Sequence, residues 1–307
     1  MKRFLLNITA FTVLIYIILW IPQYLFDHRA CNNHTVWPFK EFNRMDEWYP
    51  DSVADELLVM GNSRGYHYVP EVMKEFYSGC VENLSMRGYS FDFQYHMMLK
   101  KYLQKDYHPK YILQEVGPFS FFGYVNPKLN IAFFPYIQRS ELAFMYDFRP
   151  GLTVFDKYLP IKYRGNLDKM YDYWKEMDWY DTLQESDDMP KSYCIDNIPF
   201  HVEYFEPSII HLFHSYIQEC DSLGIKLILI VSPMHTEDGI PKYDWDSFNH
   251  IMDSVTAGYD LPLLDYTRYF GNDTTYFNDP IHLTQDASRI YSRIVMHDLD
   301  SLGLIRN

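Results

Sequence analysis

Short apolar runs alternate with helical segments along this chain, and this order restricts the possible folds more than any other feature. The clearest run is IKLILIV at 225–231, and the others lie at 56–60, 80–85, 110–117 and 261–265. Apolar runs of this length between turn residues are typical of buried strands in a parallel sheet. Helical spacing follows or precedes them at 70–76, 91–105, 207–223, 245–256 and 284–302. The alternation predicts an α/β fold, a three-layer sandwich with a flavodoxin-like parallel five-stranded sheet.

The segment 118–206 interrupts this alternation. It is crowded with Phe, Tyr and Trp and carries six prolines between 127 and 199. We expect a largely helical and irregular insertion over the strand ends, where long inserts usually serve as lids or binding elements. Structural padding and a membrane-facing surface are the alternatives.

The amino terminus predicts a membrane anchor. Lys2 and Arg3 precede an almost uninterrupted apolar run at 4–21, and about twenty apolar residues span a bilayer as a helix. Basic residues before such a run predict a cytoplasmic amino terminus. A cleaved signal peptide is one alternative, although the small-x-small cleavage pattern is missing; a buried core helix is the other.

We therefore expect three regions along the chain. Residues 1–24 form a single-pass signal anchor in the cytoplasmic membrane, 25–50 a connector, and 51–307 one α/β domain that contains the insertion. That domain is expected outside the cytoplasm, in a periplasmic or extracellular space.

Composition excludes some partners. A formal net charge of -14 argues against nucleic acid, because phosphate binding requires clustered Lys and Arg. The 28 tyrosines suit sugar faces and interfaces, although a Tyr-rich core or a compositional habit explains them equally well. The four cysteines include no Cys-x-x-Cys pair, so metal-ligand spacing is absent and no metal or cofactor is predicted.

A serine stands directly after the first predicted strand, in Gly61-Asn62-Ser63. Ligands of open α/β sheets bind beyond the carboxyl ends of the strands, so Ser63 lies where chemistry is expected. Gly61 permits a tight turn, and the backbone N–H groups after it can face a developing anion. The alternative is that Ser63 only caps the following helix, a position that serine favours.

Asp279 and His282 lie three residues apart, just before the last predicted helix. One turn of chain can bring the carboxylate to the Nδ1–H of the imidazole, which leaves Nε2 able to take a proton from a serine hydroxyl. Because this segment and the Ser63 turn both follow strands, the fold is expected to place them at the same sheet edge. A hydrogen bond that only stabilises the loop is the alternative.

This combination resembles the SGNH (GDSL-like) hydrolase superfamily, with the match at about 55–118 and 207–302. Gly61-Asn62-Ser63 is similar to the Gly-Asp-Ser of that family, and the segment from Asn83 to Gly88 resembles its second element. The resemblance implies that Ser63 is the nucleophile, His282 the general base and Asp279 its orienting carboxylate. It also implies that the backbone N–H groups of Ser63 and Gly88 form the oxyanion hole.

Two positions depart from the family pattern. Asn62 replaces the usual aspartate, which varies in other branches. The third element normally supplies an Asn side chain to the oxyanion hole, but the third strand here ends in Gln114-Glu115-Val116-Gly117-Pro118. Loss of one oxyanion donor costs on the order of a hundredfold in rate, so either another group substitutes or the activity is slow or specialised.

Three further side chains are candidates for contact with substrate together with Asn62: Arg64, Glu115 and His235. The alternative for Glu115 is a salt-bridged structural residue. His235 follows the fourth strand, and a surface or structural histidine is its alternative.

The layout of anchor, Gly-x-Ser and late Asp-x-x-His is similar to membrane-anchored relatives such as the D-alanyl-lipoteichoic-acid transfer proteins. This resemblance predicts a serine esterase or O-acyltransferase that acts on acylated cell-envelope or extracellular carbohydrate. A membrane-bound acyltransferase is a possible partner. The alternative function is a catalytically silent envelope protein that binds glycan or such a partner.

Overall fold

A computed structural model describes residues 2–30, 56–85, 91–95, 108–121, 205–240 and 243–306. The chain divides into two compact units, Met1–Tyr49 with Asn126–Asp187, and Pro50–Val125 with Asp188–Asn307. Residues 25–30 of the predicted connector belong to a described helix, whereas its remainder and nearly all of the predicted insertion lie outside the described residues. The predicted domain boundaries therefore stay predictions.

The described part of the first unit is one helix, α1 (Lys2–Ala30), of 29 residues. Among the residues that the structure describes, no helix is both long enough and apolar enough to cross a membrane. The predicted transmembrane helix is thus not supported.

The second unit is built on a five-stranded sheet whose neighbouring strands are all parallel, in the order β2-β1-β3-β4-β5. This is the flavodoxin-like order, so the predicted sheet is confirmed. The strands are β1 (Glu56–Met60), β2 (Cys80–Asn83), β3 (Tyr111–Glu115), β4 (Lys226–Val231) and β5 (Leu263–Asp265). The first strand, β1, lies next to the edge strand β2, and after β2 the chain crosses to β3 on the other side of β1, which places the switch point between β1 and β3.

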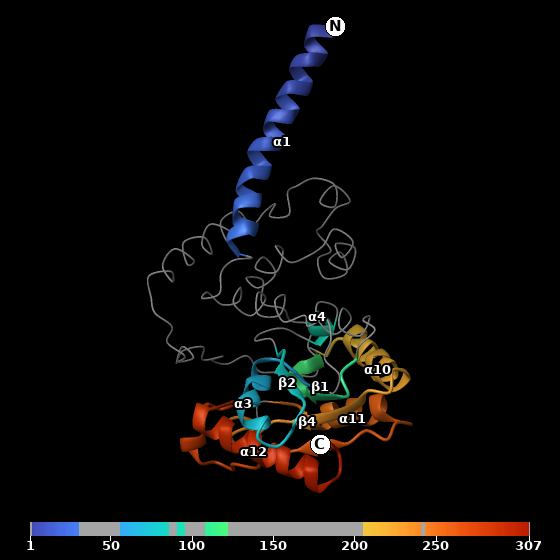
Figure 1. The fold of residues 1–307 in the computed structure, drawn as a ribbon, viewed down its shortest axis with the longest axis vertical. Helices are drawn as coiled ribbons and strands as arrows, with labels where there is room; N and C mark the ends of the chain where they lie inside the picture. The colour runs from blue at the N-terminus through green and yellow to red at the C-terminus, as the bar shows by residue number, and fades with distance from the viewer. Residues whose placement is uncertain are drawn as a thin grey trace. The chain divides into compact units, whose positions relative to one another are not determined.

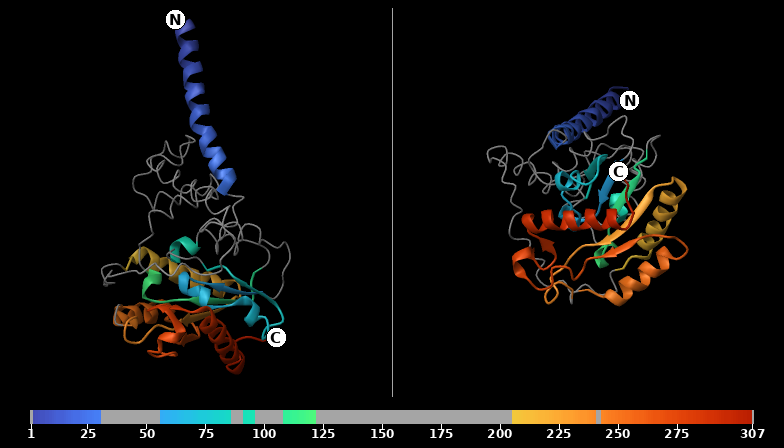
Figure 2. Two further views of the ribbon diagram at one scale, coloured as in Figure 1. Left: turned by 90° about the vertical axis from the view of Figure 1, so that its left-hand side faces the viewer. Right: turned by 60° about the horizontal axis from the view of Figure 1, so that its bottom comes forward.

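Helices cover both faces of the sheet (Figure 1, Figure 2). The short α3 (Pro70–Met73) packs with α12 (Gln285–Ser301) on one face, and α10 (Pro207–Ser222) packs with α11 (Trp245–Thr256) and α4 (Phe91–Gln94) on the other. The core on the α12 face uses alternate strand residues, among them Leu57, Val59 and Leu113, against Tyr291 and Val295. Side chains alternate between the faces of a strand, so the apolar runs supply both cores.

The segment before the last helix differs from the loop expected there. Phe277–Asp279 (β6) and His282–Leu283 (β7) form a small antiparallel ribbon. In this ribbon Asp279 pairs with His282 across a two-residue turn. Thr284 then caps α12, its side chain accepting from the backbone N–H of Ala287 at 3.2 Å.

Candidate active site

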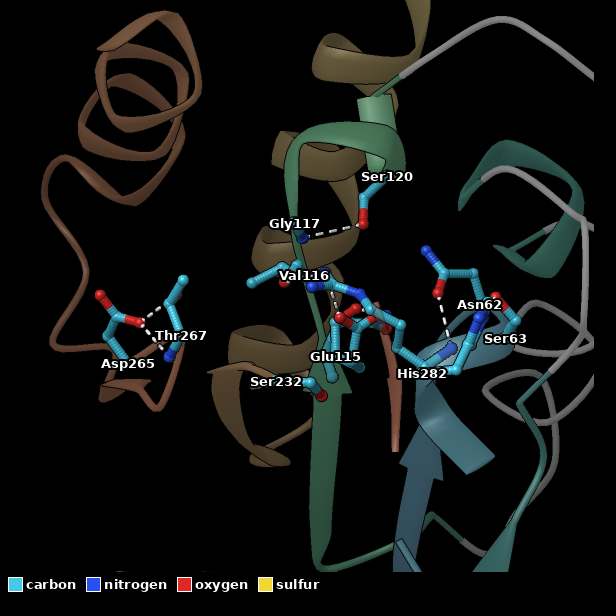
Figure 3. A network of polar contacts seen from close by, with 12 residues as sticks. Asn62, Ser63, Glu115, Val116, Gly117, Ser120, Ser232, Asp265, Thr267 and His282 are labelled. Carbon is cyan, nitrogen blue, oxygen red and sulfur yellow. Dashed lines mark hydrogen bonds and ion pairs between the residues drawn. The ribbon is translucent and has the colours of Figure 1, made fainter. Parts of the chain in front are cut away.

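The nucleophile candidate Ser63 begins the short 3-10 helix η1 (Ser63–His67), directly after β1. Asn62 caps this helix: its Oδ1 accepts from the backbone N–H of Arg64 at 3.0 Å (Figure 3). The alternative that Ser63 is the cap is therefore wrong. Gly61 is required before it, because a Cβ atom there would lie 2.7 Å from the Cβ of Glu115. The capping role of Asn62 leaves the hydroxyl of Ser63 available for another partner.

That partner is the imidazole of His282, and the structure joins Ser63, His282 and Asp279 in one chain of hydrogen bonds. The Oγ of Ser63 lies 2.8 Å from Nε2 of His282, and Nδ1 of His282 lies 2.7 Å from Oδ2 of Asp279. An ionised carboxylate can only accept, so Nδ1 carries the hydrogen of the neutral ring. Nε2 consequently accepts the hydroxyl proton, which is the arrangement that general-base activation of a serine requires.

Asp279 is held as a carboxylate. Burial raises its pKa, but the hydrogen bond and charge interaction with His282 and the backbone N–H groups of Ile281 and His282 together lower the pKa below its ordinary value. Those two N–H groups donate to Oδ1 at 2.9 and 3.0 Å, which leaves Oδ2 for the imidazole. The short ribbon thus fixes both the charge of the carboxylate and its direction.

His235 stabilises this ribbon without touching the three side chains. Its backbone N–H donates to the carbonyl of Pro280 at 2.9 Å, and Gly239 approaches the same carbonyl so closely that a Cβ atom would collide with it. The ring of His235 is buried, accepts from the N–H of Asp238 at 3.2 Å and bonds the carbonyl of Asn272 at 3.0 Å. This is the structural role that we gave as its alternative.

Arg64 and Glu115 are buried rather than presented to substrate. Both side chains are 0% exposed, and Nη2 of Arg64 lies 2.5 Å from Oε1 of Glu115. The same Nη2 donates to the carbonyl of Val116 at 3.1 Å, and the guanidinium lies 4.3 Å from the ring centre of Phe119 (Figure 3 labels Glu115 and Val116). The salt-bridged alternative for Glu115 is what the structure contains.

The oxyanion donors are partly described. Ser63 is the first residue of η1, so its N–H has no acceptor within the helix. Gly88 lies outside the described residues. In the third element, Gln114 donates to the carbonyl of Glu115 at 3.0 Å, and the N–H of Gly117 donates to Oγ of Ser120 at 3.1 Å (Figure 3). These two donors are used internally and do not replace the missing asparagine.

Three side chains without a predicted role, those of Asn83, His67 and Ser292, hold the segment that follows Ser63. Nδ2 of Asn83 donates to the carbonyls of Gly65 and Tyr68, both at 2.8 Å. Oγ of Ser292 donates to the carbonyl of His67 at 3.1 Å, and Nε2 of His67 accepts from the backbone N–H of Leu283 at 3.1 Å. A polar residue that ends an apolar strand is a usable signal for Asn83. No local sequence pattern indicates the roles of His67 and Ser292, because the contacts from His67 to Leu283 and from Ser292 to His67 join residues more than two hundred positions apart.

Fold and geometry together define the class of site. A serine at the end of an interior parallel strand, hydrogen-bonded to a histidine that a partly buried carboxylate orients, is the arrangement of serine hydrolases that act through a triad.

The chain was compared with family models, curated proteins and solved structures. No family model matches the chain, and no curated protein matches it. Among solved structures, a family two carbohydrate esterase from Clostridium thermocellum, in complex with cellohexaose, is 8% identical, with 83% of this chain and 67% of that chain covered and a TM-score of 0.41. A protein assigned to the lipolytic G-D-S-L family from Desulfitobacterium hafniense is 10% identical (80% and 99% covered, TM-score 0.40). One assigned as an SGNH hydrolase from Slackia heliotrinireducens is also 10% identical (80% and 98%, TM-score 0.41).

Proposed function

We propose that this protein is a serine esterase or O-acyltransferase of the SGNH type. The observation that carries the proposal is the continuous chain from the Ser63 hydroxyl through His282 to Asp279, with separations of 2.8 and 2.7 Å. A serine hydroxyl is a weak nucleophile at neutral pH, and a base within hydrogen-bond distance is what activates it.

The proposed reaction runs in two halves. Ser63 Oγ attacks the acyl carbonyl carbon while His282 Nε2 takes the hydroxyl proton, and the Ser63 N–H stabilises the developing oxyanion. His282 then returns the proton to the leaving alcohol, which breaks the ester bond and leaves an acyl-serine. Water or a sugar hydroxyl gives its proton to His282 and attacks the carbonyl carbon of the acyl-serine. His282 then returns that proton to Ser63 Oγ as the bond between Oγ and the acyl carbon breaks, which releases the acid or the new ester and restores the free serine. Asp279 stays ionised and stabilises the imidazolium in both halves.

For the substrate we propose an acylated carbohydrate of the cell envelope or the extracellular space. The resemblance of the motif layout to envelope acyl-transfer proteins supports this choice. The proposed location of the α/β unit, periplasmic or extracellular, is supported by the Lys-Arg pair followed by the apolar run at 4–21. Protease accessibility in cells stripped of wall and outer membrane, with the cytoplasmic membrane intact, tests the location: cleavage of the α/β unit is expected, and complete protection contradicts it.

The absent asparagine favours a second candidate. Because loss of an oxyanion donor lowers the rate of acyl transfer, its absence is compatible with a catalytically silent protein that binds glycan or a partner membrane acyltransferase. The hydrogen-bonded serine argues for the enzyme, because a binding protein has no need of an activated hydroxyl.

Labelling with a fluorophosphonate probe separates the two candidates. The full chain should be labelled, and the labelling should disappear in Ser63→Ala and in His282→Ala. Ser208→Ala and His297→Ala are matched controls, because both side chains are exposed and lie away from the triad. Both controls should be labelled like the wild type.

Labelling that persists in Ser63→Ala would refute the assignment of the nucleophile. A folded wild type without any labelling would favour the silent protein. If labelling is seen, release of acetate from an acetylated oligosaccharide, measured with and without an acceptor glycan, distinguishes hydrolysis from transfer.

A further inference from the structure

His67 joins the two halves of the candidate triad. It is the last residue of η1, the helix that begins with Ser63. Its Nε2 accepts from the backbone N–H of Leu283, the residue directly after His282, at 3.1 Å. One side chain therefore connects the element that carries the nucleophile to the strand that carries the base.

The protonation state of His67 follows from this bond. Nε2 accepts a hydrogen bond, so it carries no hydrogen, and the hydrogen of the neutral ring is on Nδ1. The side chain is buried, 2% exposed, and burial, followed by the charges of His282 and Arg64, lowers its pKa well below the ordinary value. A neutral ring is what the contact requires, since a protonated Nε2 could not accept from Leu283.

The surroundings hold the ring in place. The ring of His67 lies edge-on to the ring of His282, with 6.2 Å between centroids, and edge-on to Tyr291 at 6.5 Å. Its backbone carbonyl accepts from Ser292 of α12 at 3.1 Å. The hydrogen bond from His67 to Leu283 thus joins two elements, one that carries Ser63 and one that carries His282.

We propose that His67 is a positioning residue, which sets the Ser63–His282 distance through its hydrogen bond to Leu283. This inference rests on the proposed function, and it assigns to His67 a role that the motif residues do not supply. A displacement of about 1 Å between reacting groups can cost on the order of a hundredfold in rate, so a contact that holds Ser63 and His282 at hydrogen-bond distance should affect the rate strongly.

Two amide substitutions test the proposal as a matched pair. In His67→Gln the amide oxygen can reach the place of Nε2 and accept from Leu283. In His67→Asn the same amide is one methylene shorter and cannot reach. Both variants bury similar polar groups, so a difference between them reports the hydrogen bond rather than general packing.

We expect kcat for hydrolysis of p-nitrophenyl acetate to fall on the order of tenfold to a hundredfold in His67→Asn with KM little changed. His67→Gln should recover most of that loss. Fluorophosphonate labelling should follow the same order. The downfield proton resonance of His282 Nδ1–H should be kept in His67→Gln and lost or broadened in His67→Asn.

Equal kcat in the two variants, with equal resonances, would overturn the positioning role even if both melt below the wild type. If the wild type neither hydrolyses the ester nor is labelled, the proposed function fails, and the resonance alone then decides the role of His67. Should His67→Asn not fold, His67→Gln decides: near-native kcat and resonance support the link, and their loss overturns it.

Discussion

Glu115→Gln should destabilise the fold strongly, because it removes one charge of a buried ion pair. Arg64 and Glu115 are both 0% exposed and lie 2.5 Å apart. Breaking a buried pair by removing one partner costs about 3–5 kcal/mol, since the remaining charge is left without compensation in a poorly solvated place. Arg64→Met combined with Glu115→Gln should cost far less than the sum of the two single changes, because no buried charge remains.

The single variants Arg64→Met and Glu115→Gln should differ in how their free energy of unfolding depends on pH. Burial raises the pKa of Glu115, and Arg64 opposes that rise. In Arg64→Met the folded protein keeps the proton on Glu115 to a higher pH than the unfolded chain, whose pKa is about 4.3. Stability should therefore fall as pH rises above about 4, until Glu115 ionises in the fold. Glu115→Gln should show no such slope from this site, because Arg64 stays charged.

Urea unfolding followed by tryptophan fluorescence between pH 4 and 8 measures both effects. Glu75→Gln is the control: it breaks the pair of Glu75 with Arg293, whose side chains are 53% and 49% exposed and 3.6 Å apart. An exposed pair contributes about 0–1 kcal/mol. Additive costs for the Arg64 and Glu115 changes, or a cost of Glu115→Gln no larger than that of the control, would refute the reasoning.

Two further predictions concern the carboxylate of the proposed triad and the residue that precedes Ser63. Asp279→Asn should lower kcat on the order of ten-thousandfold while the protein stays folded, because the amide no longer fixes the tautomer of His282. The lowered pKa of Asp279 contributes stability above about pH 4 that is lost on acidification, so the acid slope of the unfolding free energy should be shallower in this variant; an unchanged slope contradicts it. Asn62→Ala should cost about 1 kcal/mol through the lost cap of Arg64 N–H, whereas Asn62→Asp keeps an acceptor and should be near neutral. Equal melting temperatures for the two Asn62 variants would contradict the capping role.

Local patterns were enough to predict most of the fold. The helix expected at 245–256 has the bounds of α11, and the run at 225–231 contains β4, because apolar periodicity reports which side chains face a core. The parallel five-stranded sheet followed from the alternation of strands and helices. The ribbon at 277–283 was missed, since its strands are too short to carry a period.

The sequence by itself determined the sheet, the three long helices that follow residue 206 and the three residues of the proposed triad. Motif spacing is local information, and it was sufficient to single out Ser63 and the Asp279–His282 pair. Only the tertiary structure decided which neighbour caps η1 and that Arg64 and Glu115 are buried together. It also revealed that His67 reaches Leu283. These contacts join residues 51 to 216 positions apart, or depend on the direction of a single turn. Their geometry exists only once the strands and helices have packed, so no local pattern encodes it.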